Sequence, residues 1–172
     1  MEKNHTRKLT MAGILIATGV VCSPFSIPLG SARCFPVQHM VNILSAVFLG
    51  PFYGFSMAFI TSLIRLMLGT GSLLAFPGSM CGALLCGLVF RYTQKLSFTY
   101  LGELFGTSIL GALAAYPIAT MVMGKEAALF AYVIPFFISC SGGVVLGAIL
   151  VAAIQKTGVM NYVLNDKSRH HL

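Results

Sequence analysis

Three polar residues, Gln38, His39 and Asn42, interrupt the otherwise apolar stretch RCFPVQHMVNILSAVFLGPFYG. At helical spacing, Gln38 and His39 lie one turn before Asn42, so the three side chains share a face. A polar side chain in hydrocarbon is costly unless it has a partner or a task. The stretch therefore indicates either hydrogen bonds that bridge helices or contacts to a small molecule.

Polar and aromatic residues at a similar depth occur in the other apolar segments. A pocket with a few convergent polar groups and aromatic walls fits a small molecule, and neutral donors favour a flat, largely uncharged heterocycle. The alternatives are snorkelling of Arg65 to the interface and a place for the tyrosines in the interfacial belt. We predict a substrate site formed by Gln38, His39, Asn42, Arg65, Ser79, Tyr116, Tyr132 and Ser139.

The sequence carries few signals for ATP hydrolysis, proton coupling or proteolysis. There is no G-x-x-x-x-G-K-[ST] phosphate loop, so the chain is not expected to hydrolyse ATP in that way. Glu103 is the one acidic residue near an apolar segment, at its predicted start, so we expect no carboxylate within a span for proton coupling. An intramembrane serine protease would need Ser139 or Ser141 with His39, but no oxyanion set is evident. A self-sufficient channel or exchanger also stays open.

The five cysteines do not suggest a metal or disulfide framework. Their number is odd, no C-x-x-C pair exists, and most lie in apolar segments as small hydrophobes. We predict no disulfide, no metal and no cofactor.

Composition indicates an all-α integral membrane protein of one domain, residues 1–172. Hydrophobic residues make up 57% of the chain and charged residues 9%, with a mean hydropathy of +0.88, against about 25% charged in soluble domains. Because a transmembrane helix needs about 20 apolar residues, we predict a six-transmembrane-helix bundle. Its helices are expected at about 9–27, 37–49, 51–68, 75–91, 101–123 and 127–155.

The charges predict the orientation of the bundle. The net charge of +7 does not form a stripe of the kind that binds nucleic acid. With the N-terminus inside, eight basic residues fall on the inner side, against Arg33 and Lys125 outside, so both termini are expected in the cytoplasm. A cleaved signal in the first segment is the alternative, although that run is long for one. The inner residues are Lys3, Arg7, Lys8, Arg91, Lys95, Lys156, Lys167 and Arg169.

Glycine spacing predicts close helix packing. Gly78, Gly82 and Gly87 recur at the same offsets as glycines 102, 106 and 111, and such small-xxx-small faces let helix backbones approach. Gly50 and Pro51 suit a helix end followed directly by a helix start, which predicts a tight hairpin.

The chain resembles the substrate-binding S components of energy-coupling factor (ECF) vitamin transporters. The resemblance runs from Lys8 to about Lys156 and includes FLGPFYGFSMAFITSLIRLMLGTGSLLAFPGSMCGALLCGL. With ARCFPVQHMVNILSAVFLGP included, it is most similar to the ThiW group, which is assigned to uptake of hydroxyethylthiazole, the thiazole precursor of thiamine. The pyrimidine precursor and thiamine itself stay open as ligands.

The resemblance implies a multi-pass protein of the bacterial cytoplasmic membrane that binds its substrate near the outer face. It also implies partners, a transmembrane T subunit and two cytoplasmic ATPases, and a subunit that tips over in the membrane to release substrate. S components dock on the T subunit through Ala-x-x-x-Ala in the first helix. Here Ala12 is followed by Ile16, whereas Gly13 and Ala17 keep the small-xxx-small spacing, so we expect docking through Gly13 and Ala17 with Ala12 beside them.

Overall fold

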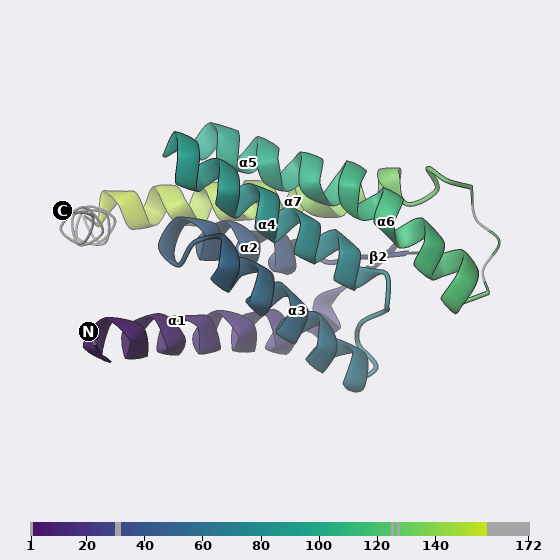
Figure 1. The fold of residues 1–172 in the computed structure, drawn as a ribbon, viewed down its shortest axis with the longest axis horizontal. Helices are drawn as coiled ribbons and strands as arrows, with labels where there is room; N and C mark the ends of the chain where they lie inside the picture. The colour runs from purple at the N-terminus through teal and green to yellow at the C-terminus, as the bar shows by residue number, and fades with distance from the viewer. Residues whose placement is uncertain (1, 30–31, 125, 127, 158–172) are drawn as a thin grey trace.

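The computed structural model describes residues 2–29, 32–124, 126 and 128–157, and it is a bundle of helices (Figure 1). The first turn of α1 and the last turn of α7 lie at one end, which we call the terminal end (Figure 1). The small β-sheet and the α3–α4 connection lie at the other, the hairpin end. The elements are α1 (Glu2–Val21), η1 (Ser23–Phe25), β1 (Ile27–Leu29), β2 (Ala32–Cys34), α2 (Pro36–Phe48), α3 (Pro51–Met67), α4 (Ala75–Thr93), α5 (Leu96–Phe105), η2 (Gly106–Gly111), α6 (Ala112–Pro117), η3 (Ile118–Val122) and α7 (Val133–Lys156).

Several helices have the length and composition of membrane spans. Within the described residues, three are long and apolar enough to cross a bilayer: Ala75–Thr93, the continuous helical run Leu96–Val122, and Val133–Lys156. The apolar helix α3 is shorter. Many large apolar side chains on the outside of the bundle are exposed, among them Phe52, Met67 and Ile149. A helical membrane protein is the fold class that follows.

The predicted C-terminal end of the first helix is wrong. The helix was expected to continue to residue 27, but α1 ends at Val21 and is followed by a 3-10 turn and a β-hairpin. Pro24 and Pro28 lack the N–H that a helix interior requires, and proline disfavours helical backbone in the residue before it. The expectation of a purely helical chain is therefore corrected by this hairpin, in which Ile27 pairs with Cys34 and Pro28 with Arg33.

Two further boundaries differ from the prediction. The fifth helix begins at Leu96 rather than 101, which places Glu103 two turns inside it. The last helix begins at Val133 rather than 127, after a connection that contains Gly124 at φ 61°. Two π-helical segments, η2 and η3, interrupt the fifth helix, and such segments often occur near functional sites.

The predicted glycine faces pack against each other inside the bundle. A Cβ added at Gly111 would lie 2.6 Å from the Cα of Gly78, and one added at Gly82 would overlap the hydroxyl of Thr107. Larger residues would therefore separate α4 from η2. The predicted Gly50–Pro51 hairpin is confirmed, because Gly50 has φ 95° and Pro51 opens α3.

Candidate binding site

A cavity opens at the hairpin end of the bundle. Its volume is about 550 Å³, including the part that is open to the outside, which is within the range of small-molecule pockets. Helices α2, α3, α4 and α7 line it together with η2, strand β2 and the α3–α4 connection. The lining residues with polar side chains are Arg33, Gln38, His39, Arg65, Thr70, Ser72, Ser79, Thr107 and Ser139.

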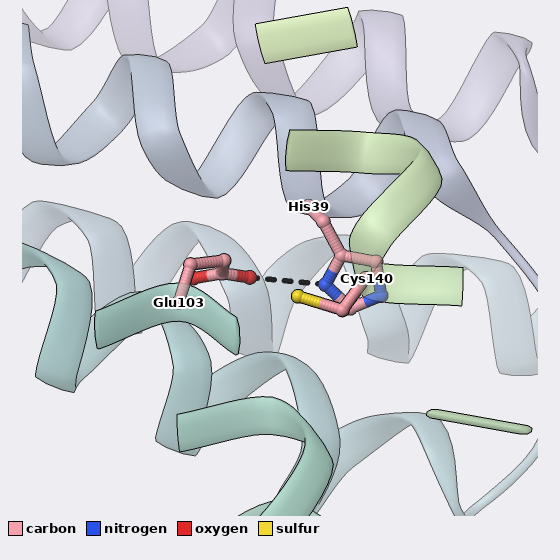
Figure 2. Close-up of side chains that lie close together, drawn as sticks. All are labelled: His39, Glu103 and Cys140. Atoms are coloured by element: carbon pink, nitrogen blue, oxygen red, sulfur yellow. Dashed lines mark hydrogen bonds and ion pairs between the residues drawn. The ribbon is translucent and has the colours of Figure 1, made fainter. Parts of the chain in front are cut away.

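Glu103 lies beneath His39 at the centre of a buried hydrogen-bond cluster. Its Oε1 atom is 3.0 Å from Nδ1 of His39, and it accepts hydrogen bonds from Nδ2 of Asn42 at 2.9 Å and from the Thr107 hydroxyl at 3.3 Å. Because Oε1 already accepts two hydrogen bonds, we assign the Nδ1 proton to His39. Figure 2 shows this pair, with the other ring nitrogen of His39 turned away from the carboxylate.

Asn42 is placed behind the cavity rather than on its wall. It is 1% exposed, and its amide nitrogen also donates to the Ser79 carbonyl at 3.2 Å. Its side-chain oxygen accepts from Nε2 of Gln38 at 3.3 Å. With these bonds made, Asn42 joins α2 to α4 and α5 and holds Gln38 and Glu103 in place.

Ser139 ties the β-hairpin to the last helix. The backbone N–H of Phe35 donates to the Ser139 hydroxyl at 2.7 Å. In the hydrogen bonds of the described residues, Ser139 is not joined to His39, whose Nδ1 faces Glu103. The Ser139–His39 pairing that one form of the serine protease alternative requires is therefore not among the hydrogen bonds of the described residues.

Arg65 is a buried cation on the cavity wall. Its side chain is 3% exposed, and its guanidinium carbon lies 3.5 Å from the centre of the Phe35 ring. The N–H groups of Thr70 and Gly71 donate to the Arg65 carbonyl at 3.0 and 2.9 Å, which fixes the end of α3. Snorkelling to the outer surface does not describe so buried a side chain.

The two predicted tyrosines lie outside the cavity lining. Tyr132 is fully buried and packs against Phe136, with ring centroids 6.2 Å apart. Tyr116 is partly buried on α6. Of these three aromatic residues, Phe136 is the one that reaches the cavity wall. The structure thus brings Gln38, His39, Arg65, Ser79 and Ser139 to the cavity and leaves Asn42, Tyr116 and Tyr132 outside it.

One group of potential metal ligands occurs in the part of the chain that the structure describes. A ring nitrogen of His39, a carboxylate oxygen of Glu103 and Sγ of Cys140 lie within 4.8 Å of one another (Figure 2). The nitrogen and the oxygen are already joined by a hydrogen bond, so a metal would have to replace the proton between them. We assign no metal to this group.

The model of one protein family, described as thiamine-precursor transporter protein (ThiW), matches residues 9–157. The chain belongs to the ThiW family. No curated protein and no solved structure matches it. The family indicates a multi-pass membrane transporter of a thiamine precursor, and the match covers both the cavity and the Glu103 cluster.

Glu103 is the residue of this ThiW chain that the sequence analysis missed. With the fifth helix predicted from residue 101, the carboxylate was placed at a helix start, whereas it is 0% exposed in the bundle. The signal was present, because Leu96–Phe105 continues the apolar run back to Lys95 and Glu103 is then an acidic residue within a helix. Such a residue requires a partner, and His39 and Asn42 were the available ones.

The first helix of the ThiW chain divides its small residues between two faces. Ala12 is 5% exposed and packs with Val41, Leu49 and Met57 inside the bundle. Gly13 and Ala17 are exposed, and a Cβ at Gly13 would meet nothing within 4 Å. Ala12 therefore does not share the open face, and we no longer place it in the docking set.

Proposed function

We propose that this chain is the S component of an ECF transporter and captures hydroxyethylthiazole in the cavity at the hairpin end. The observation that carries the proposal is a cavity lined by His39 and Gln38, supported from below by Glu103, in a chain of the ThiW family. The T subunit and two ATPases supply the energy for import through the bacterial cytoplasmic membrane.

His39 is the central recognition residue in this proposal. In the tautomer with the proton on Nδ1, facing Glu103, the Nε2 atom of His39 is an acceptor for the hydroxyl group of the ligand. Gln38, Ser79 and Ser139 offer further donors and acceptors around it, and Phe136 offers an aromatic face to the thiazole ring. Asn42 acts through Gln38 and Glu103 and has no direct contact with the ligand.

Two measurements test the ligand. Mass spectrometry of small molecules retained on the purified chain should identify a compound that contains the thiazole ring. Calorimetry with hydroxyethylthiazole, the pyrimidine precursor and thiamine should give the tightest binding for the first. Tightest binding of either other compound would keep the S-component role and replace the ligand.

Transport by the lone chain tests the S-component role itself. Reconstituted alone, the chain should bind ligand but accumulate none, and uptake should appear only with the T subunit and ATPases. Concentrative uptake by the chain alone would favour an exchanger and overturn the proposal.

The proposed topology places both termini in the cytoplasm and the hairpin end outside. Cys34 is buried and is a poor reporter of this. In a variant without the five native cysteines, Glu126→Cys should react with an impermeant thiol reagent in intact cells, because Glu126 is exposed in the α6–α7 connection. Arg91→Cys is the matched control, exposed in the last turn of α4, and should react only after lysis. The reverse pattern would invert the bundle.

A further inference from the structure

Two arginines share the cavity wall with no acidic residue. The described lining residues include Arg33 and Arg65 but neither Asp nor Glu. Glu103, which lies behind the lining, contacts His39, Asn42 and Thr107 through Oε1, whereas its Oε2 atom is buried and has no hydrogen-bond partner among the described residues. The described lining therefore carries two arginines and no acidic side chain, and no ion pair joins Arg65 to a described carboxylate.

Arg65 is a buried cation with a fixed orientation and no acidic partner among the described residues. It is 3% exposed, no described acidic side chain pairs with it, and its Nε atom has no hydrogen-bond partner among the described residues. A buried charge without a partner is strongly unfavourable. Its orientation is nevertheless fixed, by the Phe35 ring against its plane and by the backbone bonds at the end of α3. A fixed guanidinium fork suits carboxylate and phosphate groups, which it can bind with two parallel hydrogen bonds.

We propose that Arg65 forms a second subsite of this cavity, for an anionic group, a carboxylate or a phosphate monoester, so that an anionic thiazole binds more tightly than hydroxyethylthiazole itself. Arg33, exposed on β2 at the same cavity, attracts the anion at the entrance. The proposal rests on the proposed function in one respect, that the anionic group is attached to a thiazole. The ring then lies near His39 and the anionic group near Arg65, in place of the missing counter-ion.

The test compares three thiazoles on the purified full chain in nanodiscs by calorimetry at low salt. They are hydroxyethylthiazole, its phosphate monoester, and the acid in which the terminal CH₂OH group is oxidised to a carboxylate. At least one anionic form should bind about tenfold or more tightly than the alcohol, because hydrogen bonds to a charged partner are the stronger ones. The anionic form that binds more tightly shows whether the subsite prefers a phosphate or a carboxylate.

Arg65→Gln should remove the preference for the anion and leave affinity for the alcohol within about threefold. Arg33→Gln should weaken the anion less and mainly slow its association. Arg91→Gln, at the terminal end of α4, is the matched control and should change nothing. Equal or weaker binding of both anions in the unmodified chain, or a preference that survives Arg65→Gln, would overturn the proposal.

Thermal unfolding without ligand distinguishes an anion-binding Arg65 from an Arg65 that stabilises the bundle. Because the free guanidinium is unpaired, Arg65→Gln should unfold at the same temperature as the unmodified chain or higher. A clear loss of stability would mean that Arg65 holds the bundle together, and would overturn the proposal.

Inorganic phosphate keeps the test independent of the thiazole. At equal ionic strength against chloride, phosphate should raise the unfolding temperature of the unmodified chain and not that of Arg65→Gln. If no thiazole binds but phosphate acts through Arg65, the proposed function fails and the anion site stands. If phosphate acts on neither and no anionic thiazole is preferred, the anion site fails.

Discussion

Glu103 and Arg65 are two buried ionisable side chains in one bundle, and they differ in their partners. Glu103 is fully buried and is contacted by His39, Asn42 and Thr107. Arg65 is nearly as buried but has an aromatic ring beside it and no acidic partner in the described chain. The contrast shows two arrangements of a buried charge: Glu103 has three partners within the fold through one carboxylate oxygen, and Arg65 has no acidic partner among the described residues.

The largest expected effect is at Glu103. Glu103→Ala removes the shared partner of three buried groups, and each buried group left without a hydrogen bond costs about 1–3 kcal/mol, so this variant should lose the most unfolding free energy. Unfolding of the purified chain in mixed micelles measures the loss. Glu126→Ala, at an exposed acidic residue, is the control and should have little effect. Full stability of Glu103→Ala would mean that the cluster does not support the fold.

The next largest effects distinguish His39, which lines the cavity, from Asn42, which lies behind it. His39→Ala should weaken binding of the thiazole ligand by about 1–3 kcal/mol, since the ligand loses a hydrogen-bond partner. Asn42→Ala should instead lower the unfolding free energy by about 1–3 kcal/mol, because it leaves Gln38 and the Ser79 carbonyl without a partner. Calorimetry and unfolding of both variants give the two quantities. If Asn42→Ala reduced affinity at unchanged stability, Asn42 would belong to the ligand site.

The smallest effect on the isolated chain is expected at the open face of α1. Gly13→Leu with Ala17→Leu adds bulk on the exposed face of α1. The unfolding free energy should therefore change little, and the dissociation constant of the ligand should stay within a few fold. Co-purification with the T subunit and uptake should be lost, because the partner helix can no longer approach closely.

Ala12→Leu is the matched control, on the buried face of the same turn, and should destabilise the bundle. Normal co-purification of the double variant would move docking to another face.

Sequence reasoning reached most of the helical frame, because apolar runs, glycine spacing and the Gly50–Pro51 pair are local signals. It missed the β-hairpin, where Pro24 and Pro28 end the helix although the run stays apolar. It placed Tyr132 in the pocket from its spacing with Ser139, but the direction of a side chain depends on the neighbouring helices. Tyr132 instead packs on Phe136. The Glu103 cluster depends on contacts between residues 61 and 64 positions apart, which no local pattern encodes.

The hydrogen bond from Phe35 to Ser139 has a consequence for folding. It joins residues 104 positions apart, and Phe35 also carries the ring that lies against Arg65. Contacts of such high sequence separation form late, because a long loop must close first. The cavity wall is thus complete only once α7, the last helix of the described residues, has been made and packed. A growing chain that ends before α7 lacks one side of the cavity, so the cavity can form only after synthesis has passed this helix.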